Sequence, residues 1–139
     1  MNIIIDANEF FSCIIAHGKG LNSRTIAIFF HDDIKLYAPT KLLEELKNNE
    51  KEIASKSGLS RYEYDVLIKV LRLRVSFVPF EEFATKIKEA EALAPHLKDI
   101  EYFALALKIN AKIWSQEKAF KEQERVEIVT TDELFNVLK

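Results

Sequence analysis

The chain has 139 residues, of which 48% are apolar and ten are Phe, so it is long enough to fill one hydrophobic core. Twenty Lys and Arg against 22 Asp and Glu give a net charge of -2, which excludes a general electrostatic attraction to nucleic acid. No apolar run approaches the ~20 residues that cross a bilayer, and the single cysteine, Cys13, cannot form an internal disulfide. With no signal-peptide pattern at the start, we expect one cytoplasmic globular domain over residues 1–139 and no membrane association.

Apolar runs of strand length alternate with helical patterns along the whole chain. The pattern predicts five short strands, over residues 3–5, 34–38, 74–78, 111–115 and 126–130. It predicts helices over residues 7–16, 23–30, about 41–55, 60–73, 81–94 and 99–109, and a last helix after Thr130. Strands that are apolar on both faces and alternate with helices indicate a parallel sheet with right-handed crossovers. We therefore expect a three-layer α/β/α sandwich around a central parallel five-stranded sheet.

Polar residues define several of these boundaries. Ser60 with Glu63, and Thr130 with Glu133, have the spacing of a capping box, in which each side chain satisfies a backbone N–H of the other residue. Asn110 is expected to stop the helix that precedes it.

Four acidic residues fall where the predicted strands end or where the next helix begins. Asp6 directly follows the first strand, and Glu117 lies two residues past the fourth strand. Asp99 starts the helix that leads into the fourth strand, and Glu45 lies one turn into the helix after the second strand. In an open parallel sheet, ligands bind beyond the carboxyl ends of the strands. All four side chains can therefore reach one cleft.

Each of these acids also has a purely structural interpretation. Asp6 has the spacing of a helix N-cap relative to Glu9, and Asp99 can be an N-cap as well. Glu117 can oppose a helix dipole, and Glu45 can pair with a lysine one turn away. None of these interpretations predicts that all four acids lie at the same edge of the sheet, and we favour convergence for that reason.

Converging carboxylates favour a bound metal ion. Two like charges about 4 Å apart repel by roughly 4 kcal/mol at an effective dielectric constant of 20, which raises the pKa of the cluster. A hard divalent cation relieves this repulsion, and all-oxygen ligands suit Mg²⁺ or Mn²⁺ rather than zinc. The three histidines, His17, His31 and His96, show no metal-ligand spacing with Cys13. A metal held by carboxylates can activate water and hold a scissile phosphate, as in metal-dependent nucleases.

Four segments together carry a resemblance to a known family. They are "IIIDANEF" at the start, "APTKLLEEL" at 38–46, "KDIEYFALAL" at 98–107 and "KIWSQEKAF" at 112–120. In this order, and over nearly the whole chain, they resemble the PIN domain, the nuclease fold of VapC-type toxins and related ribonucleases.

The resemblance implies a site when it is carried over position by position. The implied catalytic and metal-binding acids are Asp6, Glu45, Asp99 and Glu117, with Asn8 and Ser115 as supporting polar residues. The fourth acid is usually an aspartate in this family, so Glu117 is a departure whose extra methylene moves the carboxylate by more than about 1 Å. Glu44 is the alternative to Glu45, because adjacent helical residues point about 100° apart.

The resemblance also implies a function. We expect a Mg²⁺- or Mn²⁺-dependent endoribonuclease that cleaves single-stranded or structured RNA, as the toxin of a toxin–antitoxin pair. Its partners would be RNA, an antitoxin protein and a second copy of the chain in a homodimer.

The sequence also allows two other functions. In the first, Glu117 weakens catalysis and the domain serves as an RNA-binding or protein-interaction module. In the second, the chain is a phosphoacceptor receiver domain. That family expects an aspartate at the end of the third strand and a lysine at the end of the fifth, where this chain has Phe77–Pro79 and Thr130–Thr131. The receiver interpretation is therefore disfavoured.

Overall fold

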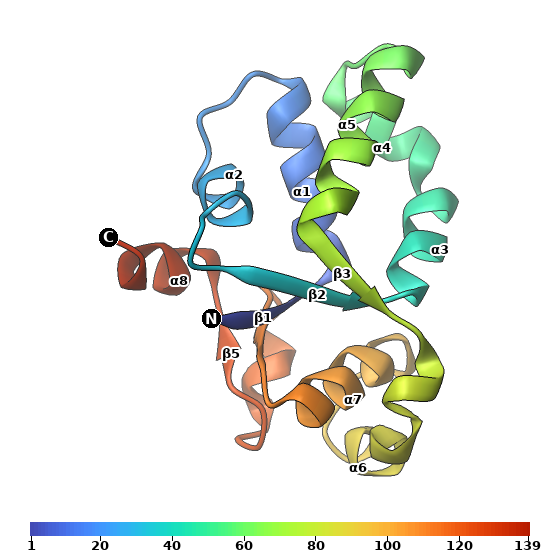
Figure 1. The fold of residues 1–139 in the computed structure, drawn as a ribbon, viewed down its shortest axis with the longest axis vertical. Coiled ribbons are helices and arrows are strands. Elements are labelled where there is room, and N and C mark those ends of the chain that lie inside the picture. The colour runs from blue at the N-terminus through green and yellow to red at the C-terminus, as the bar shows by residue number, and fades with distance from the viewer.

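A five-stranded, entirely parallel sheet forms the centre of the computed structural model, which describes residues 1–139. The strands follow the order β3-β2-β1-β4-β5 across the sheet. Their bounds are Asn2–Ile5 for β1, Lys35–Pro39 for β2, Val75–Val78 for β3, Lys112–Trp114 for β4 and Ile128–Val129 for β5. Helices cover both faces of the sheet (Figure 1). The predicted three-layer α/β/α sandwich with a parallel five-stranded sheet is confirmed.

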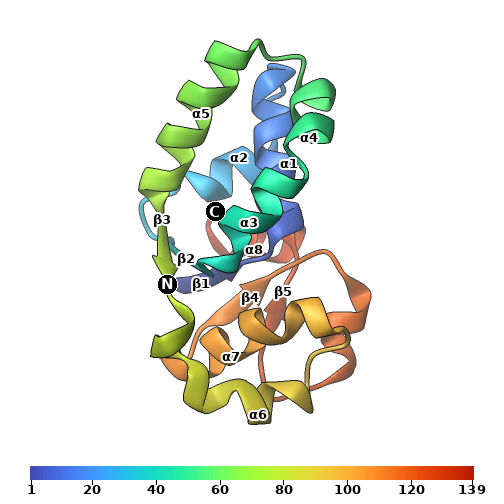
Figure 2. The ribbon, with the colours of Figure 1, turned by 90° about the vertical axis from the view of Figure 1, so that its right-hand side faces the viewer.

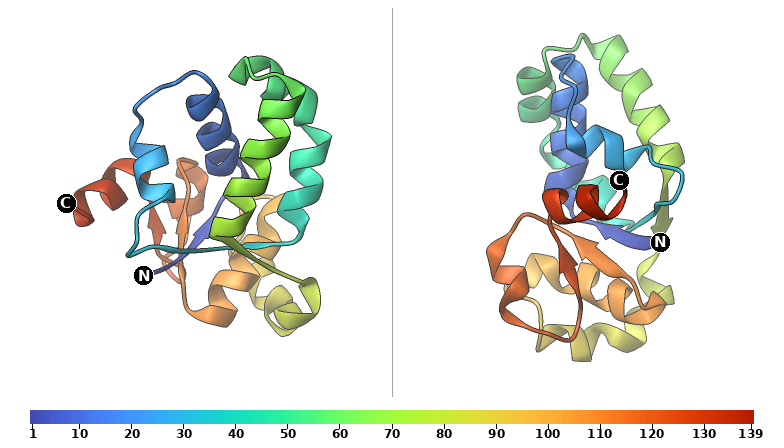
Figure 3. Two further views of the ribbon diagram at one scale, coloured as in Figure 1. Left: turned by 45° about the horizontal axis from the view of Figure 1, so that its top comes forward. Right: turned by 90° about the vertical axis from the view of Figure 1, so that its left-hand side faces the viewer.

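The helices divide unequally between the two faces. One face carries α1 (Ala7–Gly18), α3 (Lys41–Asn48), α4 (Glu50–Ser57) and α5 (Arg61–Arg74). The opposite face carries α6 (Ile87–Glu91) and α7 (Ile100–Ile109), which lie below the sheet in Figure 2. Beside this core, α2 (Arg24–Phe29) packs against α8 (Thr131–Val137), as Figure 3 shows. No helix is long and apolar enough to cross a membrane.

The order of the strands places a switch point between β1 and β4. From β1 the chain first builds β2 and β3 on one side, and it then returns to build β4 and β5 on the other side. Ile5 pairs with Trp114 in the parallel register, and the backbone N–H of Asp6 donates to the carbonyl of Trp114 at 3.1 Å. The residues that follow β1 and β4 therefore lie side by side, at the position where open parallel sheets bind ligands.

Buried residues anchor the edge of the sheet that follows β1 and β4. Ile3, Ile4 and Ile5 are completely buried, as expected for a central strand that is covered on both faces. Residues 102–106 of α7 are also buried, and α7 packs under β1, β2 and β4. The apolar segment that introduces Asp6 and the apolar helix that begins next to Asp99 thus belong to one core cluster.

The predicted caps form, but two predicted helices were wrong. Both capping boxes are present, and Asn110 stops α7 in the left-handed conformation with φ 54°. The expected helix over 41–55 is divided at Asn49, whose side chain donates to the carbonyl of Glu45 at 2.7 Å and competes with the helical backbone. The expected helix over 81–94 consists of 3₁₀ turns and the short α6, because Phe83 leaves the helical conformation (φ -124°) and is completely buried.

Candidate metal centre at the β1–β4 switch point

Asp6 and Ser115 form the inner part of the site. They occupy equivalent positions after the paired strands β1 and β4, and both side chains are buried. The hydroxyl of Ser115 donates to Oδ2 of Asp6 at 2.8 Å, and the Oγ of Ser115 itself accepts a hydrogen bond from the backbone N–H of Glu117 at 3.1 Å. Ser115 therefore orients the Asp6 carboxylate and also fixes the start of the segment that carries Glu117.

Glu45 reaches the site from α3, which covers the face of the sheet opposite α7. Its Oε1 accepts a hydrogen bond of 2.9 Å from the phenol of Tyr102 on α7. Glu44 is exposed on the solvent side of α3. The helix thus turns Glu45, and not Glu44, toward the other acids.

Asp99 precedes α7 and is only 4% exposed. Its Oδ2 is buried and has no hydrogen-bond partner. A buried carboxylate oxygen without a donor is costly, since native proteins pair nearly all buried polar groups. A cation or a water molecule at this position would satisfy this oxygen.

The structural interpretations of the acids were wrong for three of the four. Neither Asp6 nor Asp99 makes a side-chain cap to its helix. Glu45 forms no ion pair with Lys41, whose Nζ donates instead to the carbonyl of Lys98 at 2.7 Å. Glu117 occupies the position before the 3₁₀ turn Lys118–Glu122, where an acid can oppose the helix dipole, so its structural interpretation stays a prediction.

The pKa values show that the acids act on one another. Burial raises the pKa of Asp6 from 3.8 to about 6, although the bond from Ser115 opposes this change. Three further charges raise the Asp6 pKa, and they belong to Asp99, Glu117 and Glu45. The pKa values of Glu45 and Asp99 are raised as well, chiefly by burial. The four sequence-predicted acids therefore lie together in one electrostatic cluster.

His96 is the member that the sequence analysis missed. Ligand atoms of His96, Asp99 and Glu117 lie within 4.8 Å of one another, and Nε2 of His96 is 3.5 Å from Oε1 of Glu117. The spacing His-x-x-Asp at residues 96–99 was the available signal, because side chains three residues apart in a 3₁₀ turn lie above one another. A pattern of histidine and cysteine spacings alone does not reveal this combination of one histidine with two acids.

A groove extends from Glu45 along α1 and α4. It has a volume of about 490 Å³ and is lined by Asn8, Ser12, Asn49, Lys56 and Lys98, among others. Asn8, the predicted supporting residue, is exposed on the wall of this groove. Lys56 forms an ion pair with Glu52 at 2.8 Å, so part of the local positive charge is already neutralised.

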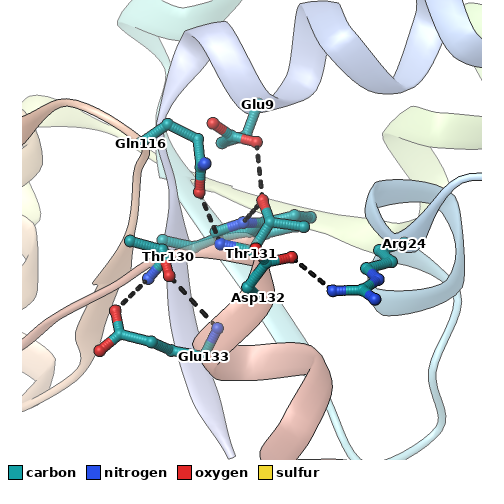
Figure 4. A network of polar contacts seen from close by, with 8 residues as sticks. Glu9, Arg24, Gln116, Thr130, Thr131, Asp132 and Glu133 are labelled. Atoms are coloured by element: carbon teal, nitrogen blue, oxygen red, sulfur yellow. Dashed lines mark hydrogen bonds and ion pairs between the residues drawn. The ribbon is translucent and has the colours of Figure 1, made fainter.

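A second buried acid, Glu9, lies next to the cluster. The hydroxyl of Thr131 donates to its Oε2 at 3.4 Å and accepts the indole N–H of Trp114 at 3.0 Å (Figure 4). The backbone N–H of Thr131 donates to the side chain of Gln116 at 2.6 Å. Burial, followed by the charge of Asp6, raises the Glu9 pKa from 4.5 to about 7. Glu9 thus links the segment carrying Glu117 to the start of α8.

Asp132 has a different role. It lies in the first turn of α8 and forms an exposed ion pair with Arg24 at 2.7 Å, also drawn in Figure 4. This arrangement is typical of an acid in the first turn of a helix.

The donor set fits a divalent cation. The cluster offers carboxylate oxygens, the ligands that Mg²⁺ and Mn²⁺ prefer, and the unpartnered oxygen of Asp99 lacks a donor within the protein. Asp6, Glu45, Asp99 and Glu117 form no ion pair with Lys or Arg, although the charges of Lys41 and Lys98 act on Glu45 and Asp99 from a distance. These residues can hold a cation that neutralises their combined charge.

The fold and this cluster define a parallel α/β protein with acidic residues at the switch point of its sheet. A family model described as PIN domain matches residues 4–136, and the chain belongs to the PIN domain family. The structure of VapBC2 from Rickettsia felis bound to a DNA fragment from their promoter is similar, with a TM-score of 0.63 and 14% sequence identity. The match covers 94% of this chain and 98% of that chain, and at this identity it shows the fold alone. A comparison with curated protein sequences finds no match.

Replacing Glu9 by Gln should flatten the pH dependence of stability in the metal-free protein. Because the folded-state pKa of Glu9 lies above the ordinary value, its contribution to stability is present below pH 4.5 and is lost as the pH rises through about 7. A pKa change from 4.5 to about 7 corresponds to about 3 kcal/mol. Urea unfolding at pH 5 and pH 8 should show most of this loss in the wild type and little of it in Glu9→Gln. The exposed Glu81→Gln is the control, and an equal flattening there would contradict the assignment.

Replacing Ser115 by Ala should raise the pKa of Asp6 above about 6, because the carboxylate loses the hydroxyl that stabilises its charged form. We expect a rise of roughly one pKa unit, measured by carbon-13 NMR titration of the Asp6 carboxyl group without added metal. Ser55→Ala, on the exposed face of α4, is the matched control. An unchanged Asp6 pKa in Ser115→Ala would show that this hydrogen bond does not tune the site.

Proposed function

We propose that this protein is a metal-dependent endoribonuclease that hydrolyses RNA phosphodiester bonds with Mg²⁺ or Mn²⁺. The observation that carries the proposal is the convergence of four acids around a buried carboxylate oxygen, Oδ2 of Asp99, that has no partner in the protein. Membership of the PIN domain family supports the same activity.

Each residue has a definable part in this proposal. Asp6, Asp99 and Glu117 would hold the cation, and Glu45 would complete the acidic set from α3. When bound, the cation supplies a Lewis acid that activates water and stabilises charge on the scissile phosphate. Ser115 and Tyr102 hold two of the carboxylates in fixed orientation, which lowers the cost of assembling the site.

The groove beside Glu45 is the proposed path for RNA. Lys98 and Lys56 can contact phosphates there, and the exposed amide of Asn8 can contact a nucleotide next to the cleaved bond. Because the net charge of the chain is -2, attraction to RNA must come from such local groups. Single-stranded or locally unpaired RNA fits this requirement better than a long duplex, because its bases are free to enter a groove.

The biological setting is a further part of the proposal. The fold is similar to a chain in the VapBC2 structure, and this supports a toxin that is restrained by an antitoxin protein. A homodimer and a cytoplasmic location stay predictions from the sequence.

A second candidate function is a PIN domain with weakened catalysis that acts as an RNA-binding or protein-interaction module. The observation in its favour is Glu117, a glutamate where the family usually has an aspartate. The longer side chain places its Oε1 3.5 Å from Nε2 of His96, so it has a polar neighbour in the absence of any metal.

Neutralising the acids should abolish RNA cleavage. Asp6→Asn and Glu45→Gln should each lose at least about a hundredfold in cleavage rate, because each removes charge from the cluster that holds the cation. Glu44→Gln is the matched control, since it changes the neighbouring exposed residue, and it should retain the wild-type rate within about twofold. The measurement is cleavage of a fluorescent single-stranded RNA with 1 to 5 mM Mn²⁺ or Mg²⁺. Equal cleavage by the wild type and Asp6→Asn would refute the proposal.

Shortening Glu117 distinguishes the two candidate functions. In the structure the Glu117 carboxylate lies within 4.8 Å of a ligand atom of Asp99, so Glu117→Asp should withdraw it and lower cleavage about tenfold. An inactive wild type that gains activity through Glu117→Asp would instead favour the interaction module.

A further inference from the structure

The loop before α7 brings His96 beside two of the acids. His96 has extended backbone angles and starts the 3₁₀ turn Leu97–Asp99, and the backbone N–H of Asp99 donates to its carbonyl at 3.0 Å. This turn places the imidazole and the Asp99 carboxylate on the same side of the chain. Glu117 approaches the imidazole from the segment after β4, at 3.5 Å.

The separations suit one shared ion. Metal–ligand bonds to nitrogen and oxygen are about 2.0–2.2 Å long, so two ligands of one ion lie at most about 4.4 Å apart. The ligand atoms of His96, Asp99 and Glu117 lie within 4.8 Å of one another, and a shift of a few tenths of an ångström would bring all three within bonding distance. The His96 side chain is 55% exposed, which leaves it free to make such a shift.

Two observations point to a ligand at this position. Asp99 is only 4% exposed to solvent, yet its Oδ2 has no hydrogen-bond partner. In addition, the imidazole of His96 and the carboxylate of Glu117 each place a ligand atom within 4.8 Å of a ligand atom of Asp99. An ion between the three residues would satisfy the unpartnered oxygen of Asp99 and contact both of its neighbours.

We propose that His96 is a metal ligand, and that its nitrogen makes the site prefer a first-row transition ion such as Mn²⁺ over Mg²⁺. Mg²⁺ takes oxygen ligands almost entirely, whereas an imidazole adds affinity for transition ions. The proposal also gives Glu117 a role, because the longer acid reaches an ion that lies toward His96. The inference rests on the metal-binding part of the proposed function and does not depend on the substrate being RNA.

Pulsed electron paramagnetic resonance of the full chain with one equivalent of Mn²⁺ at pH 7.5 tests the nitrogen ligand directly. The wild type should show hyperfine coupling from a directly bound nitrogen-14, and His96→Gln should lose it. His17→Gln, an exposed histidine at the far end of α1, is the matched control and should keep it. Wild-type Mn²⁺ spectra without nitrogen coupling, or coupling that survives in His96→Gln, would overturn the proposal.

Calorimetric titration provides a second measurement. His96→Gln should bind Mn²⁺ about tenfold more weakly, since loss of even an outer partner of a ligand costs about that much, while its Mg²⁺ affinity should stay within about threefold. Equal losses for both ions would overturn the proposed preference, and absence of binding by the wild type would overturn the metal site itself.

RNA cleavage in the same preparations separates this inference from the proposed function. Nitrogen coupling without cleavage would leave His96 as a ligand and refute the nuclease. Cleavage with oxygen ligands alone would support the nuclease and refute the role of His96.

Discussion

The concentration of negative charge at one edge of the sheet is the constraint on which the site depends. Asp6 and Asp99 are buried, and Glu45 and Glu117 add charge from two further segments. Like charges in such a place cost free energy, because burial and mutual repulsion both oppose ionisation. The raised pKa of Asp6, about 6, expresses that cost. A bound cation converts the same charges from a cost into binding energy, and this is why the account centres on a metal.

The rest of the fold keeps the charged groups from separating. Asp6 directly follows three completely buried isoleucines, and α7 anchors the segment that begins at Asp99 through buried residues against β1, β2 and β4. Ser115 and Tyr102 then fix two carboxylates by single hydrogen bonds of 2.8 and 2.9 Å. A large apolar core therefore offsets the cost of the small polar cluster, as is common where a functional site is less stable than its scaffold.

Strong local signals allowed most of the fold to be predicted from the sequence. The isoleucine strand, the two capping boxes and Asn110 each depend on nearby residues, and all of them appear in the structure. The helix over 81–94 was wrong because a tertiary contact, the burial of Phe83, decides the backbone there. Proximity of Asp6, Glu45, Asp99 and Glu117 could be inferred from parallel topology, since strand ends meet at one edge. His96 could not be found by that rule, because it enters the site from a loop rather than from the end of a strand.

His96 and Glu117 lie together at the outer side of the acidic cluster. The family resemblance made Glu117 look like a defect, whereas the structure gives it a neighbour that can share an ion. Anomalous X-ray scattering at the manganese absorption edge, from crystals grown with Mn²⁺, tests the central claim most directly. We expect one strong anomalous-scattering peak from Mn²⁺ among Asp6, Asp99 and Glu117, with His96 in contact with the ion. Full occupancy of Mn²⁺ elsewhere, or no peak at this edge with millimolar Mn²⁺, would contradict it.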